Sequence, residues 1–193
     1  AVGGAIGRLL PGPLALVGGW TLATATMGLL ALVAAAVVWT MLPPSSQVQM
    51  NRGSLSRQVL GTVTAPRDFV VAAVCVAGFA LMGVFVGIYN ATAFRLDSAP
   101  FALGHTVIFV YLSYLIGVLA PMLMSALAHR IGRGPATLVG VGLLGAGVAI
   151  LSMPSLPAVL IGLGVLTFGF LGTHSLLSGW VVDRAHRQGS RTA

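Results

Sequence analysis

Residues 69–94 read FVVAAVCVAGFALMGVFVGIYNATAF, a stretch without one charged side chain. An α-helix of roughly 20 residues, rising ~1.5 Å per residue, crosses the ~30 Å hydrocarbon layer of a bilayer, so this stretch is long enough to span it. Further apolar runs occupy 1–17, 20–42, 103–128, 135–152 and 157–182. The run at 1–17 is short. The sequence therefore predicts an all-α, polytopic transmembrane bundle of about six helices.

The composition excludes a soluble domain. Of the 193 residues 57% are hydrophobic, and only 7% are charged, namely ten arginines and three aspartates. Such a small set of charges cannot cover the surface of a soluble protein. The net charge of +7 would suggest nucleic acid, but lysine is absent and the arginines fall between apolar runs. Cys75 is the single cysteine, and no metal or cofactor motif is expected.

The gap at 43–68 is the longest polar stretch, and it opens with Pro43-Pro44, which ends the preceding helix. We interpret it as a linker between two helical bundles. The predicted organisation is therefore two helices of one bundle in 1–42, a linker in 43–68, and four helices of a second bundle in 69–193.

The arginines fix the expected orientation. One side of the bundle carries the linker, the 129–134 turn and the 183–193 tail, and its arginines are Arg52, Arg57, Arg67, Arg130, Arg133, Arg184, Arg187 and Arg191. The opposite side carries only Arg95. Because arginine-rich short loops stay on the cytoplasmic side, the first group is predicted to be cytoplasmic.

Small residues four positions apart let membrane helices approach closely, because lipid gives no hydrophobic drive to association. The pairs with this spacing are Gly3 and Gly7, Gly83 and Gly87, and Ala136 and Gly140. These helices are therefore predicted to pack on one another.

Polar side chains inside the apolar runs are the candidate site residues. Tyr89 and Asn90 end a face at helical spacing that also holds Phe79, Met82 and Val86. The face could line a cavity, or it could be ordinary core. Tyr111, Ser113 and Tyr114 add hydroxyls to the 103–128 run, where Pro121 permits a bend. The alternative is that these tyrosines lie at the interface between membrane and water.

Two of the ionisable residues within the apolar runs are candidates. His174 is deep in 157–182, with Ser175 and Ser178 nearby, and an intramembrane ionisable group is a functional candidate. A neutral histidine that bonds to a neighbouring helix is the alternative. Arg8, in 1–17, is either an intramembrane charge facing protein or water, or an interfacial side chain.

The turn SALAHRIGRG at 125–134 resembles the cytoplasmic signature of the major facilitator superfamily. Arg130, Gly132 and Arg133 match it, while Ser125 and His129 stand where the family has glycine and aspartate. The resemblance implies a gating role for the matching residues. The missing acid puts the usual charge pair in doubt.

The stretches GGAIGR at 3–8 and HSLLSGW at 174–180, in this order, are similar to bacterial inner-membrane transporters of the YnfM-like efflux type. The resemblance implies a partial major-facilitator fold, about helices five to ten of twelve, in a multi-pass inner-membrane protein. It further implies proton-linked export of a small organic solute or drug by alternating access, with the other helices outside this sequence. The alternatives are an intramembrane hydrolase using His174 with Ser175 or Ser178, and a non-transporting membrane scaffold.

Overall fold

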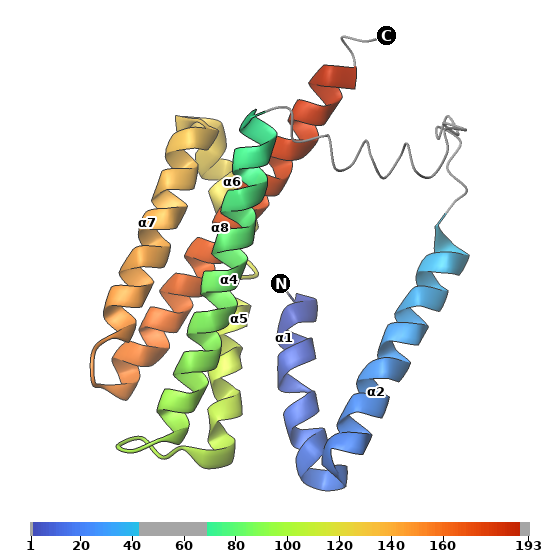
Figure 1. Cartoon of the computed structure of the whole chain (residues 1–193), viewed down its shortest axis with the longest axis vertical. Coiled ribbons are helices and arrows are strands. Elements are labelled where there is room, and N and C mark those ends of the chain that lie inside the picture. Colours follow the sequence, from blue (N-terminus) through green and yellow to red (C-terminus); the bar gives the residue numbers. More distant parts are fainter. Residues whose placement is uncertain (1, 43–68, 190–193) are drawn as a thin grey trace. The chain divides into compact units, whose positions relative to one another are not determined.

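The computed structural model describes residues 2–42 and 69–189, and these form helices without any strand (Figure 1). The elements are α1 (Val2–Leu9), α2 (Pro11–Met41), α4 (Phe69–Asp97), the 3₁₀ helix η2 (Gly104–Leu112), α5 (Ser113–Ile116), α6 (Ala120–Ile131), α7 (Arg133–Leu151) and α8 (Leu156–Gly189). The described residues contain five helical segments long and apolar enough to cross a membrane, at 11–41, 69–97, 110–131, 133–151 and 156–184. The predicted all-α transmembrane fold is confirmed.

The chain divides by its contacts into two units, one of residues 10–69 and one of residues 1–9 with 70–193. The predicted linker at 43–68 lies outside the described residues. In the second unit the short helix α1 lies against η2 and α5, so one contact boundary falls before Leu10 and the other falls after Phe69.

The first unit contains α2, whose side chains are exposed on almost every face. Ala23 is its buried residue, whereas Trp20 and Trp39 are exposed. An apolar helix with no polar face is typical of a membrane span. The gap between the predicted runs 1–17 and 20–42 is a helix break at Gly18-Gly19, with Gly19 at φ 70°. The run at 1–17 is interrupted at one residue, because α1 ends at Leu9 and α2 begins at Pro11, which has no N–H to donate, while Leu10 between them keeps helical dihedral angles.

The run at 103–128 is not one helix either. It begins as η2, continues for one turn as α5, and restarts as α6 at Ala120. Pro121 lies in the first turn of α6, where its missing N–H breaks no helical bond. The proline therefore lies where the 103–128 run restarts as a new helix, and a 3₁₀ stretch within a helix often marks a hinge.

Helices α7 and α8 form the densest packing in the second unit, and they run side by side in Figure 1. Glycines bring their backbones into contact. A Cβ built on Gly147 would lie 2.5 Å from the backbone nitrogen of Leu166, and one on Gly169 would lie 2.6 Å from that of Leu144. These distances leave no room for any side chain at either position.

The predicted small-residue pairs divide into two groups. Ala136 and Gly140 are buried in α7, and Gly140 lies against Thr173 of α8, so this pair is confirmed as a packing contact. A Cβ on Gly3, Gly7, Gly83 or Gly87 would meet nothing within 4 Å. Close approach at these four glycines is not found in the part of the chain that the structure describes.

The end of α4 is tied to the end of α7 by Arg95. Its guanidinium donates to the backbone oxygen of Leu151 and, at 2.7 Å, to that of Met153. The same group lies 5.6 Å from the centre of the Phe101 ring. A cation is favoured at these carbonyls, because the C-terminus of a helix carries partial negative charge.

Candidate functional site

A row of aromatic rings fills the space between α4, α5 and α8. The Phe85 ring stacks on Phe170 with centroids 3.9 Å apart and lies 4.8 Å from Tyr89. Tyr114 lies 4.9 Å from Tyr89, and His174 lies 5.6 Å from Phe170. The row thus connects Tyr89 of α4 with His174 of α8 through ring contacts.

Hydroxyl groups join the same three helices. Tyr89 is 1% exposed, and its hydroxyl lies 2.6 Å from Ser113 Oγ of α5 and 2.5 Å from Thr167 Oγ1 of α8. Ser113 also donates to the Val110 oxygen, and Thr167 to the Leu163 oxygen, each at 2.6 Å. Burying a hydroxyl without a partner is unfavourable, so this network makes a polar centre possible in an apolar bundle.

The structure brings three of the four predicted path residues together. Tyr111 stacks on Tyr89 at 5.8 Å, and the aromatic row leads on to His174. Asn90 is exposed and lies outside the row. On the face proposed for α4, Phe79 is 83% exposed while Tyr89 is buried. The buried face of α4 carries Phe85, Tyr89, Thr92 and Leu96.

His174 is half-buried and lines a cavity of about 280 Å³ between α4 and α8. The α4 wall consists of Val74, Cys75 and Gly78, and the α8 wall adds Leu177, Ser178 and Val181. An imidazole at the edge of such a cavity can donate, accept or carry a proton.

The neighbouring serines do not bond to this imidazole in the described structure. Ser178 donates to the backbone oxygen of His174 at 2.9 Å, and Ser175 donates to that of Gly172 at 2.8 Å. A serine nucleophile needs its proton directed at the base. The geometry therefore gives no support to a hydrolytic site at His174.

The turn between α6 and α7 depends on one glycine. Gly132 has φ 90°, and its N–H donates to the Ala128 oxygen at 3.0 Å. A Cβ at this position would meet only Pro135 Cδ, at 3.8 Å. The requirement for glycine is therefore set by the backbone conformation and not by crowding.

Arg133 begins α7 and reaches α8. Its Nη2 lies 2.6 Å from Asp183 Oδ2, and its Nη1 donates to the Gly179 oxygen at 3.4 Å. The carboxylate that pairs with this arginine thus comes from α8, since His129 stands where the resembled family has an acid. Arg130 is exposed at the end of α6, and Arg8 lies in α1 with its side chain outside the described part.

Sequence reasoning missed Phe85, Thr167 and Phe170. Phe85 and Phe170 lie one helical turn from Tyr89 and His174, a spacing that places them on the same faces. Thr167 lies two turns from His174. The spacing was therefore a usable signal, once the inward face of α8 was known.

A family model described as Major Facilitator Superfamily matches residues 1–193. "Inner membrane transport protein YnfM" of Escherichia coli is 29% identical over 97% of this chain and 45% of its own length. "Uncharacterized MFS-type transporter YybF" of Bacillus subtilis is 25% identical over 96% of this chain and 46% of its own length. The chain spans about half the length of these curated relatives. No solved structure matches it.

Proposed function

Because the chain belongs to the major facilitator superfamily, we propose that it is part of a secondary-active transporter. The cargo is a small organic solute or drug, which is exported across a bacterial inner membrane in exchange for protons. Residues 1–42 supply the end of one bundle and 69–193 part of the other, and the remaining helices of the full-length transporter lie outside this sequence.

The main support for the proposal is the group of aromatic rings and bonded hydroxyls around Tyr89, which continues through ring contacts to His174. Aromatic faces accommodate apolar and cationic organic groups, while a few hydroxyls fix orientation. The row lies between α4, α5 and α8, so a change in the packing of these spans alters its walls. Alternating access at such a site needs no covalent chemistry.

In this mechanism His174 is the proton-carrying group of the described spans. Its imidazole is the ionisable side chain beside the aromatic row, and a membrane span holds such a group chiefly where it faces protein or water. Tyr89 and Tyr111 form the substrate wall, and Asn90 is proposed at its margin. Arg130, Gly132 and Arg133 control the cytoplasmic turn.

Substrate-dependent proton movement tests the proposal directly. Inverted vesicles that contain the full-length protein are loaded with a pH-sensitive dye and challenged with a panel of organic cations and uncharged drugs. A proton efflux that depends on both the added compound and the protein is expected. If uptake of a compound proceeds while the dye signal stays flat, proton coupling is refuted.

Arg133→Ala is expected to slow turnover more than it weakens substrate binding. The substitution removes the ion pair with Asp183, which lies at the turn and not in the aromatic row. Both side chains are nearly half-exposed, so the pair is worth at most about 1 kcal/mol, which corresponds to a rate change of about fivefold. Transport rate and substrate Kd are measured on the same preparation.

The exchanged pair Arg133→Asp with Asp183→Arg is the control. It is expected to restore much of the rate, since the attraction survives reversal of the two charges. An equal loss of rate and affinity in Arg133→Ala would contradict a conformational role.

A further inference from the structure

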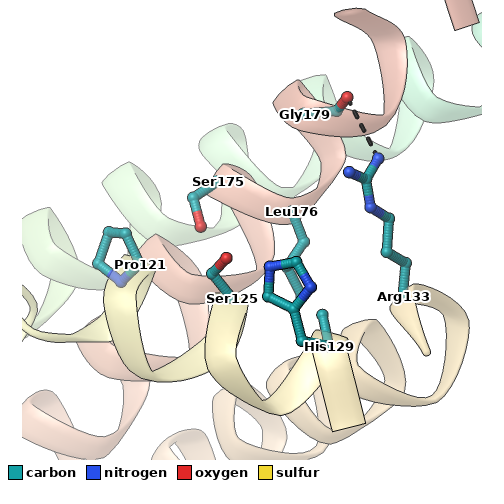
Figure 2. Close-up of a pocket in the computed structure, with 8 residues that line it drawn as sticks. Pro121, Ser125, His129, Arg133, Ser175, Leu176 and Gly179 are labelled. Carbon is teal, nitrogen blue, oxygen red and sulfur yellow. Dashed lines mark hydrogen bonds between the residues drawn. The ribbon is translucent and has the colours of Figure 1, made fainter. Parts of the chain in front are cut away.

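A second cavity, separate from the aromatic row, lies between α6 and α8 beside the α6–α7 turn. Its volume is about 300 Å³. Figure 2 shows Ser125 and His129 on α6, Arg133 at the start of α7, and Ser175 on α8 around it. Pro121 and Leu176 add apolar wall. The cavity therefore combines hydrogen-bond donors from three helices.

The polar groups of this cavity are donors suited to an anion. Arg133 offers guanidinium N–H groups, His129 offers a ring N–H, and Ser125 offers a hydroxyl. The Arg133 bond to the Gly179 oxygen, at 3.4 Å, is longer than the usual 2.7–3.2 Å range and weak. This edge of the guanidinium is available to a better acceptor.

The surrounding charge also favours an anion. Asp183 holds the other edge of Arg133, and it is the only carboxylate in the described part of this end of the bundle. Arg130 lies on the same turn, and Arg184 lines the adjoining hollow with Arg133 and Asp183. Three guanidinium groups and one carboxylate therefore lie at this end of the second unit, and their net positive charge favours an anion.

We propose that this cavity binds a phosphate group. Phosphate offers several acceptor oxygens at once, and an arginine fork is the side chain that best matches two of them. Arg133 binds one edge of the phosphate, His129 donates from the opposite wall, and Ser125 donates from α6. Ser175 closes the α8 side, where its hydroxyl turns from the Gly172 oxygen toward the ligand.

Two sources supply such a group, a phospholipid headgroup and free inorganic phosphate, and the experiment separates them. The thermal midpoint of the full-length protein in detergent is measured against sodium phosphate and against sodium chloride at equal ionic strength. Retained phosphatidylglycerol is measured by native mass spectrometry after extraction from nanodiscs. A saturable rise of the thermal midpoint with phosphate assigns the site to the free ion. Retained phosphatidylglycerol without such a rise assigns it to the lipid headgroup.

His129→Asp is the informative variant, because it places a carboxylate in the cavity. Residue 129 is exposed, so the fold tolerates the change. Loss of one charged hydrogen bond and addition of repulsion are expected to weaken phosphate binding about tenfold or more, whichever source applies. His129→Gln, which keeps a donor, is expected to retain part of the binding.

Gly134→Asp is the matched control. It adds the same charge to the same turn, but a Cβ at residue 134 meets nothing within 4 Å and the residue does not line the cavity. Its phosphate response is expected to fall much less than that of His129→Asp, because its carboxylate does not line the cavity and cannot contact the ligand there. Equal loss in His129→Asp and Gly134→Asp, or no effect of either ligand on the parent protein, would overturn the site. Neither measurement depends on transport.

Discussion

Replacing Gly147 with leucine is expected to separate α7 from α8 and to prevent the second unit from folding stably. The ideal Cβ at this position lies 2.5 Å from the backbone nitrogen and 2.7 Å from the Cα of Leu166. Backbone atoms of a packed helix cannot rotate aside as a flexible side chain can. The helices must move apart, which costs about 3 kcal/mol or more in lost packing.

Gly145→Leu is the control for this prediction, since it adds the same side chain to the same helix. A Cβ at residue 145 meets nothing within 4 Å. The yield of monodisperse protein and the thermal midpoint in detergent are compared for the two variants. We expect a large loss of yield and thermal midpoint for Gly147→Leu, and values near those of the parent for Gly145→Leu. Equal midpoints in the two variants would mean that α7 and α8 do not meet through Gly147.

The second large effect is expected for His174→Ala. If His174 carries the transported proton, its removal abolishes substrate-dependent proton movement, while the amount of protein in the membrane stays near that of the parent. The residue is half-buried at a cavity edge, so loss of its ring leaves a modest packing defect. Vesicle dye assays and immunoblots of the same membranes measure the two quantities.

His174→Gln separates proton transfer from hydrogen bonding, because glutamine donates and accepts but does not titrate. Restored proton movement in this variant would assign His174 a structural hydrogen bond only. Ser178→Ala is expected to leave transport intact, since the Ser178 hydroxyl already donates to a backbone oxygen of its own helix.

The positions of the membrane spans can be predicted from hydropathy, but the type of helix within each span cannot. The run at 103–128 is predominantly apolar, and nothing in its pattern separates a 3₁₀ stretch from an α-helix. The same limit applies to glycine pairs. Gly83 and Gly87 have the same spacing as Ala136 and Gly140, yet only the second pair has a partner helix against it in the described structure. The spacing of small residues shows that a helix face permits close packing. Whether it packs depends on a partner helix that lies against it.

Part of the candidate site was predictable for a different reason. Tyr89, Tyr111 and His174 stand out because polar groups are rare in apolar spans. Their neighbours Phe85 and Phe170 do not, because an aromatic residue in a helix that is apolar all round carries no sign of the inward face. The pairing of Arg133 with Asp183 was missed because it joins residues 50 positions apart, at the two ends of a hairpin.

The hydroxyl of Tyr89 has one hydrogen, and this has a consequence for its two neighbours. Tyr89, Ser113 and Thr167 share four close oxygen pairs, the two at Tyr89 and the two to the Val110 and Leu163 oxygens, with only three hydrogens between them. Tyr89 therefore donates to at most one of Ser113 and Thr167 at a time, and its oxygen accepts from the other only when that hydroxyl turns away from its own backbone oxygen. One hydroxyl hydrogen thus couples the contact of α4 with α5 to its contact with α8.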